Sequence, residues 1–129
     1  IQEYDRAIKF ISEAIQAKEN NTDLLLVRMG YFLVLNKLNE VLKDLNKLIN
    51  LDSENPEYYD SRWAIYMEMK LYSHAIQDLE KLIILQPHRQ DELNALVKTI
   101  RIGPTYTNFR SLMTRLFKKI TGKKDEDFE

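Results

Sequence analysis

Cysteine is absent from the 129-residue chain, and only three glycines, three prolines and two histidines are present. Without cysteine there is neither a disulfide framework nor a thiolate metal site, which fits a reducing compartment. So few turn residues exclude a many-stranded sandwich or barrel and favour helices. The longest apolar run, residues 24–35, has Arg28 as its only charge. It is shorter than the about 20 apolar residues that span a membrane.

The chain has a globular composition in which the charges are segregated. It is 44% hydrophobic and 30% charged, which suits one folded domain. Residues 1–100 carry 12 Lys and Arg against 16 Asp and Glu, residues 101–124 carry seven bases and no acid, and residues 125–129 carry four acids. An acidic body therefore precedes a basic segment and an acidic tip. The sequence begins with Ile, so a signal or transit peptide cannot be judged.

A 34-residue shift superimposes three segments, residues 4–17, 38–51 and 72–85. In each of them apolar residues recur at i, i+1, i+4, i+7 and i+8, which is the stripe of an amphipathic helix. The stretches between these segments also have apolar or aromatic residues at matching positions 34 residues apart. Each unit is therefore predicted to be a pair of helices. The matched positions are Ala7/Val41/Ala75, Ile8/Leu42/Ile76, Ile11/Leu45/Leu79, Ala14/Leu48/Leu82, Ile15/Ile49/Ile83, Leu25/Tyr59/Leu93 and Phe32/Tyr66/Ile100.

The unit that ends at Pro87 resembles a tetratricopeptide repeat (TPR), a helix–turn–helix with an aromatic and small-residue pattern and the same period. Tyr59 and Tyr66 stand at its aromatic positions, and Pro87 is its closing proline. Ala75 matches its small alanine, and Leu79 stands where the family has Phe. At some positions where the motif has a small residue, this sequence has a large one. Larger side chains there should push the two helices of a pair apart or displace a neighbouring helix. These departures are Met29, Leu48, Trp63 and Leu82.

The resemblance implies an all-α fold, a right-handed superhelix of antiparallel helix pairs (a TPR-like α-solenoid) with a C-terminal capping helix. The repeat domain covers residues 1–102, and residues 103–129 add a basic amphipathic helix and an acidic tail. The repeat domain divides into the second helix of a partial repeat (1–21), two full repeats (22–55 and 56–89) and an extra helix (90–102). Helices are predicted at 2–18, 22–36, 39–51, 57–70, 73–85 and 90–102.

The resemblance also implies a concave groove, lined by the first helix of each repeat, that holds a peptide or a helix of a partner protein. Its positions carry four apolar side chains in one helix and three acids in the next, which predicts an apolar partner segment with basic residues. A slip of the first of these helices by one residue would turn Arg28 and Tyr31 into the groove instead. The predicted groove residues are Leu26, Val27, Gly30, Leu33, Val34, Glu57, Asp60, Ser61, Ala64, Met67, Glu68, Asn94, Lys98 and Arg101, and Asp23, Asp91, Ala95 and Ile102 share the register.

Patterns for catalysis and metal binding are missing from the sequence. His74 and His88 lie on different predicted elements, without Cys or carboxylates at ligand spacing. Because a phosphate-binding Gly loop and a nucleophile elbow are also missing, we predict no enzyme, no metal and no cofactor.

The family's two-carboxylate clamp grips the acidic C-terminal tail of heat-shock chaperones with Lys and Asn on successive first helices. Its residues are replaced here, and acids nearby would repel a carboxylate tail. A chaperone tail is therefore disfavoured as a ligand. The clamp positions hold Leu26, Gly30, Ser61, Asp91 and Ala95.

Residues 107–121 are predicted to form one amphipathic helix with a basic remaining surface. Three interpretations compete: a cap on the end of the repeat stack, which we favour, a helix docked on another protein, and a helix on an anionic membrane or RNA. Its apolar face comprises Phe109, Leu112, Met113, Leu116, Phe117 and Ile120, and its bases are Arg110, Arg115, Lys118 and Lys119.

These features predict a non-catalytic protein-binding scaffold or adaptor. One alternative is a structural subunit built permanently into a large protein assembly, which would aggregate unless co-expressed with its neighbours. The other is attachment to a membrane or to RNA through the basic C-terminal segment. We expect an intracellular protein, first of all a cytoplasmic one, with an organelle left open.

Overall fold

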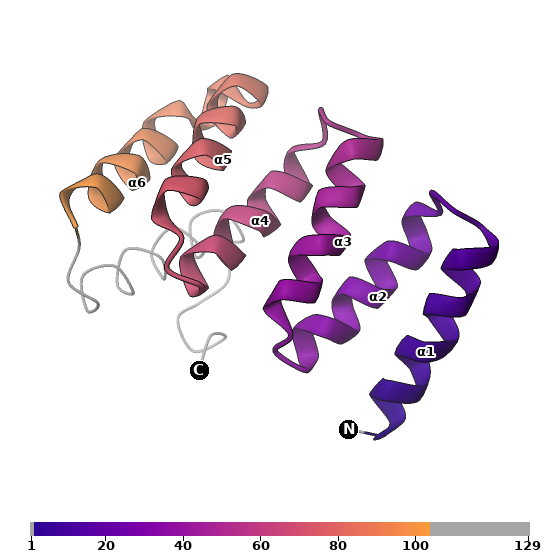
Figure 1. Ribbon diagram of the computed structural model, residues 1–129. Coiled ribbons are helices and arrows are strands. Elements are labelled where there is room, and N and C mark those ends of the chain that lie inside the picture. The colour runs from indigo at the N-terminus through magenta and orange to yellow at the C-terminus, as the bar shows by residue number, and fades with distance from the viewer. Residues whose placement is uncertain (1, 104–129) are drawn as a thin grey trace, which may run out of the picture. The chain divides into compact units, whose positions relative to one another are not determined.

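The computed structural model describes residues 2–103, and all regular structure within that range is helical. Each helix begins and ends within two residues of its predicted bounds, which confirms the all-α fold. The predicted helix over residues 107–121 lies outside the described residues. The elements in Figure 1 are α1 (Gln2–Ala17), α2 (Thr22–Val34), α3 (Leu38–Leu51), α4 (Pro56–Glu68), α5 (Tyr72–Leu85), the 3-10 helix η1 (Pro87–Arg89) and α6 (Gln90–Ile102).

The chain divides into two compact units, Ile1–Asp78 and Leu79–Glu129, with the boundary inside α5. In the first unit α2 contacts both α1 and α3, and α3 contacts α4. Short connections between helices place consecutive helices side by side and antiparallel, as α1 to α4 are in Figure 1. The assignment of these helices to particular repeats stays a prediction.

Helix ends repeat with the same period. Asn21 Oδ1 accepts a hydrogen bond from Leu24 N at 3.1 Å before α2, and Asn55 Oδ1 accepts one from Glu57 N at 3.0 Å before α4. Such caps satisfy N–H groups that have no partner within the helix. The turns after α2 and α4 both contain a residue with positive φ, Asn36 at 56° and Lys70 at 60°. Local turn chemistry therefore ends these helices where the repeat predicts.

The core of each unit includes residues at the matched apolar positions of the repeat. Leu25, Val41 and Leu45 have no exposed surface in the first unit, and Leu79 and Leu93 have none in the second. Three of the four large residues at small-residue positions of the TPR motif are buried, and the fourth, Met29, is half-buried. Leu48 and Leu82 are fully buried, and Trp63 is 4% exposed.

Candidate protein-binding surface

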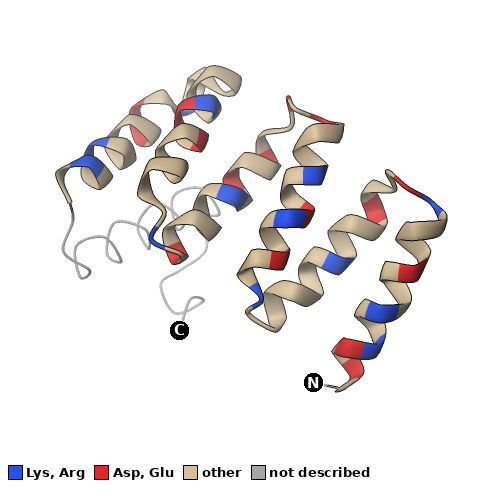
Figure 2. Cartoon of the chain, viewed as in Figure 1, with Lys and Arg blue, Asp and Glu red and all other residues tan. Residues whose placement is uncertain are grey.

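Arg28, the single charge in the apolar run of α2, is turned toward the neighbouring helices. Its Nε and Nη2 donate to Asp44 Oδ2 and Oδ1 on α3 at 3.0 and 2.6 Å, and its Nη1 donates to Ser12 Oγ on α1 at 3.2 Å. Figure 2 shows it as the blue segment of α2. The guanidinium therefore ties three helices together at the face of α2 that lies inside the unit.

The same arrangement recurs one repeat later at Arg62 on α4. Its Nε and Nη2 donate to Asp78 Oδ2 and Oδ1 at 2.9 and 2.7 Å, and its Nη1 donates to Asn46 Oδ1 at 2.8 Å. The hydrogen bond to Asp78, with the charge of that carboxylate, raises the pKa of Arg62 despite its partial burial. The cation also lies 5.6 Å from the ring centres of both Tyr59 and Tyr66.

The two arginines fix the rotation of α2 and α4 about their own axes. At about 3.6 residues per turn, Gly30 lies about 160° around the helix from Arg28, and Ala64 lies at the same angle from Arg62. Because both arginines bind the preceding and the following helix in the same way, the opposite faces of α2 and α4 point to the same side of the first unit. These two faces contain the groove residues predicted for the two repeats.

The register in which α2 slips by one residue is not the one observed. Arg28 binds α1 and α3, and the ring of Tyr31 lies against that of Tyr4 on α1, with 5.7 Å between the ring centres. Both side chains therefore lie on the packed side of α2 and not on its exposed face.

The α2 face comprises the predicted groove residues of this helix, and apart from the exposed Asp23 at the start of the helix its side chains are aliphatic. Leu26 is 36% exposed, Val27 48%, Leu33 43% and Val34 62%. Gly30 lies among them without a side chain. Contiguous exposed apolar side chains of this kind mark interaction surfaces.

The α4 face, residues Glu57, Asp60, Ser61, Ala64, Met67 and Glu68, differs in chemistry from the α2 face. Glu57, Ser61 and Glu68 are exposed and Ala64 is half-buried. Asp60 is also half-buried, and its Oδ1 accepts a hydrogen bond from Trp63 Nε1 at 3.1 Å. Met67 is only 8% exposed, so its side chain belongs to the interior and we leave it out of the proposed surface.

Asn94, Lys98 and Arg101 on α6 are exposed, as the register predicts for groove positions. They belong to the second unit. Arg101 Nη2 donates to Glu80 Oε1 at 2.9 Å, in an ion pair open to solvent. Their part in partner binding stays a prediction.

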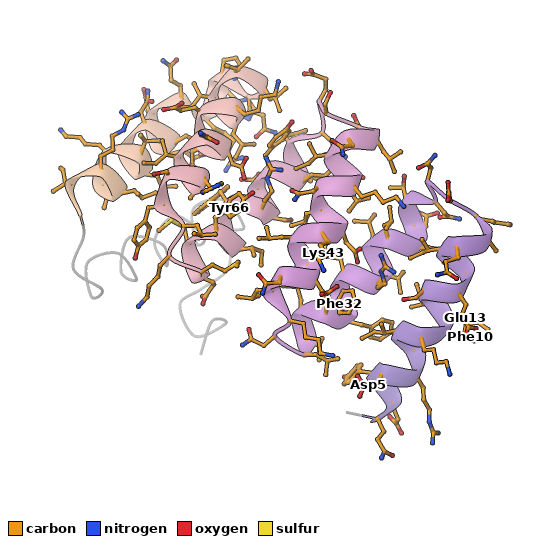
Figure 3. The ribbon with its side chains drawn as sticks, viewed as in Figure 1. Asp5, Phe10, Glu13, Phe32, Lys43 and Tyr66 are labelled. Carbon is orange, nitrogen blue, oxygen red and sulfur yellow. The ribbon has the colours of Figure 1, made fainter. Side chains whose placement is uncertain are left out.

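Another exposed apolar side chain, Phe10, lies elsewhere in the first unit. It is 76% exposed and projects from α1 on the side away from α2 (Figure 3). Phe10 stands one repeat before Asp44, the residue of α3 that binds Arg28 of α2. It therefore belongs to the helix-packing side of the repeat and not to the side of the α2 and α4 faces.

Sequence reasoning missed the two arginine–aspartate pairs, although a signal was present. Arg28 and Arg62 are identical residues one repeat apart, and so are Asp44 and Asp78. In each pair the partners are 16 residues apart. A search of the repeat for identical polar residues, and not only for apolar ones, would have singled them out.

Within residues 2–103, no group of three or more His, Cys, Asp or Glu is placed to hold a metal ion. Over the same range, no helix combines the length and the apolar character needed to cross a membrane.

Comparison with known proteins gives relatives in sequence, although no family model matches the chain. The chain is 30% identical over 99 residues to Hsp70-Hsp90 organizing protein 3 of Arabidopsis thaliana, which covers 77% of this chain and 18% of that protein. It is 29% identical over 103 residues to serine/threonine-protein phosphatase 5 of Homo sapiens, which covers 75% of this chain and 21% of that protein. The chain thus spans about a fifth of the length of these relatives.

Solved structures give the fold. The chain is similar to the crystal structure of MamA with a TM-score of 0.64 and 19% identity, over 92% of this chain and 67% of that one. It is similar to the Arabidopsis OM64 TPR domain with a TM-score of 0.60 and 24% identity, over 79% of this chain and 84% of that one. Together with the sequence relatives, the repeat period and the helices, these structures show that the chain belongs to the tetratricopeptide repeat family.

Proposed function

We propose that the protein is a non-catalytic adaptor whose α2 and α4 faces together hold a peptide or a helix of a partner protein. As a TPR chain it is a protein–protein interaction scaffold, and the proposal adds where the partner binds. The observation that carries it is the α2 face, where four aliphatic side chains are 36% to 62% exposed while Arg28 is turned inward.

The exposed aliphatic surface supplies a part of the binding free energy. Complete burial of one such side chain is worth about 1.5–3 kcal/mol, and these side chains are already about half covered. Covering all four therefore contributes roughly 3–6 kcal/mol before the entropy of association is subtracted. Further contacts on α4 are needed for micromolar affinity, which corresponds to about 8 kcal/mol.

Charge defines the chemistry of the partner segment. Every charged residue on the α2 and α4 faces is an acid: Asp23 on α2, and Glu57, Asp60 and Glu68 on α4. These acids favour lysine and arginine in the partner and repel a carboxylate tail. A segment that combines large apolar side chains with basic ones fits both faces.

The similarity to organizing proteins bears on which partner to test first. Their name connects them with Hsp70 and Hsp90, so chaperones of these kinds are the first candidates. The residues of this chain point to an apolar and basic segment of such a partner and not to its acidic tail. None of the similarities favours a permanent structural subunit or attachment to a membrane or RNA.

A pair of peptides tests the proposal. One peptide has a leucine stripe flanked by lysines, and the other has the same stripe flanked by glutamates and a free carboxyl end. We expect the lysine peptide to bind at least tenfold more tightly in fluorescence anisotropy at low salt. Equal binding, or preference for the glutamate peptide, would contradict the proposed partner chemistry.

Charge reversal then locates the site on the protein. Glu57→Lys combined with Glu68→Lys changes two exposed acids of the α4 face and leaves Asp60, which Trp63 holds, in place. We expect this variant to bind the lysine peptide about tenfold more weakly with an almost unchanged melting temperature, because exposed charges contribute little to stability. The matched control is Glu13→Lys with Glu19→Lys, two exposed acids in and just after α1. Equal loss in both double variants would mean that only the net charge matters.

A further inference from the structure

Gly30 is a helix-weakening residue for which the described part of the chain offers no structural reason. It lies in the middle of α2, where glycine is a poor helix former because it leaves the backbone most free when unfolded. Apart from its two chain neighbours and the nearby backbone of its own helix, a Cβ on Gly30 meets no atom of the described residues within 4 Å, and the φ of Gly30 is not in the positive range. Neither close packing nor backbone conformation requires glycine there.

The four residues that surround Gly30 on the surface of α2 are all aliphatic. Leu26 and Val27 lie one turn before it, and Leu33 and Val34 lie one turn after it. Residues three and four positions apart are neighbours on a helix surface. The four aliphatic side chains of the α2 face therefore surround a gap, one side chain wide, with open backbone at its base.

The equivalent position of α4 has a different character. Ala64 stands one repeat after Gly30, and its four neighbours are Asp60, Ser61, Met67 and Glu68. A methyl group fills this position, and three of its four neighbours are polar or charged. Within the first unit, the aliphatic rim around an open position therefore belongs to α2, while α4 supplies acids on the same side.

The geometry points to Gly30 as the position where a partner segment anchors one large apolar side chain, such as Leu, Met or Phe. Lysine or arginine side chains of the same segment then lie toward Asp23, Glu57 and Glu68. This inference rests on the proposed function, and it names the residue that sets specificity within that surface. Energetically dominant contacts lie near the centre of an interface in packed pockets, and the rim of the interface is polar.

The inference predicts that stability and binding change in opposite directions. Gly30→Ala adds a methyl group that contacts nothing in the described chain and improves helix propensity, so the protein should melt at a higher temperature. The same methyl group occupies the floor of the gap and keeps the anchor side chain away. Gly30→Leu fills the gap completely.

The test uses short lysine-flanked peptides of equal length that differ only in a central Leu, Phe or Ala, measured by fluorescence anisotropy. On the unsubstituted protein we expect the Leu and Phe peptides to bind at least tenfold more tightly than the Ala peptide. On Gly30→Ala the Leu peptide should bind about fivefold more weakly, although that variant melts higher. On Gly30→Leu the three peptides should bind equally weakly. Asn50→Leu, which adds a leucine at an exposed position of α3, is the control and should change nothing.

Two results would overturn the inference about Gly30 and leave the proposed function intact. One is tight binding of lysine-flanked peptides that does not depend on the central residue or on the substitution at Gly30. The other is a lower melting temperature of Gly30→Ala, since glycine would then serve packing within the chain. If no lysine-flanked peptide binds the unsubstituted protein, the proposed function fails, and the inference fails with it.

Discussion

Loss of the Asp44 carboxylate should destabilise the protein strongly, because Arg28 then loses its charged partner. In Asp44→Ala the two hydrogen bonds from Arg28 at 3.0 and 2.6 Å disappear. The side chains of Arg28 and Asp44 are 20% and 3% exposed. The variant therefore leaves a largely covered guanidinium that keeps its hydrogen bond to Ser12.

The magnitude follows from burial and from the bonds that are lost. Removing one partner of a buried ion pair costs about 3–5 kcal/mol of the free energy of unfolding. Arg28 keeps the bond to Ser12 and enough exposed surface to recruit water, so we expect the lower end of this range, about 3 kcal/mol. Replacing both partners by apolar residues of similar size, as in Arg28→Met with Asp44→Leu, should cost only about 0–1 kcal/mol. The chain itself has a leucine, Leu96, one repeat after Arg62, and it is 1% exposed.

Urea denaturation of the unsubstituted protein, Arg28→Met, Asp44→Leu and the double variant measures the coupling in one cycle, and Asp44→Ala is measured beside them. We expect the double variant to be more stable than Asp44→Ala, with a coupling free energy of about 2 kcal/mol between the two positions. The equivalent pair Arg62–Asp78, whose charged contact is 2.7 Å, should give the same result within about 1 kcal/mol. A cost for Asp44→Ala below about 0.5 kcal/mol, which is typical of an ordinary surface substitution, would refute this reasoning. So would a double variant that is less stable than both single ones.

Three further perturbations test the repeat, a turn and the predicted cap. Leu45→Ala and Leu79→Ala remove side chains with no exposed surface and should each cost about 2–5 kcal/mol of the free energy of unfolding; a cost below about 0.5 kcal/mol in urea denaturation would mean that the register is wrong. Lys70→Gly relieves a φ of 60° and should stabilise the chain by up to about 1 kcal/mol, so a lower denaturation midpoint would contradict the turn assignment. Deletion of residues 104–129 should lower the melting temperature and cause association if residues 107–121 cap the stack; unchanged melting with loss of binding to anionic vesicles would favour the membrane interpretation.

Much of the fold could be predicted because helix formation depends on residues close in sequence. The apolar stripe at i, i+4 and i+7 defines which residues share a helix face. The repeat period then fixes which helices are equivalent. These signals placed all six described α-helices within two residues and predicted buried residues such as Leu45.

The candidate surface was less predictable, because exposure depends on the rotation of each helix against its neighbours. The register assigned Met67 and Asp60 to the groove, but Met67 is 8% exposed and the carboxylate of Asp60 accepts a hydrogen bond from Trp63. The surroundings of each side chain in the folded unit decide between these outcomes, and the repeat period does not contain that information.

The sequence by itself determined the helices, their repeat and the apolar character of α2. Only the tertiary structure decided where Arg28 points, because its partners Ser12 and Asp44 lie on two other helices, each 16 residues away. It also decided that Gly30 is open among the described residues. Helix periodicity is a local property of the chain, whereas the direction of a side chain is set by the simultaneous packing of several helices.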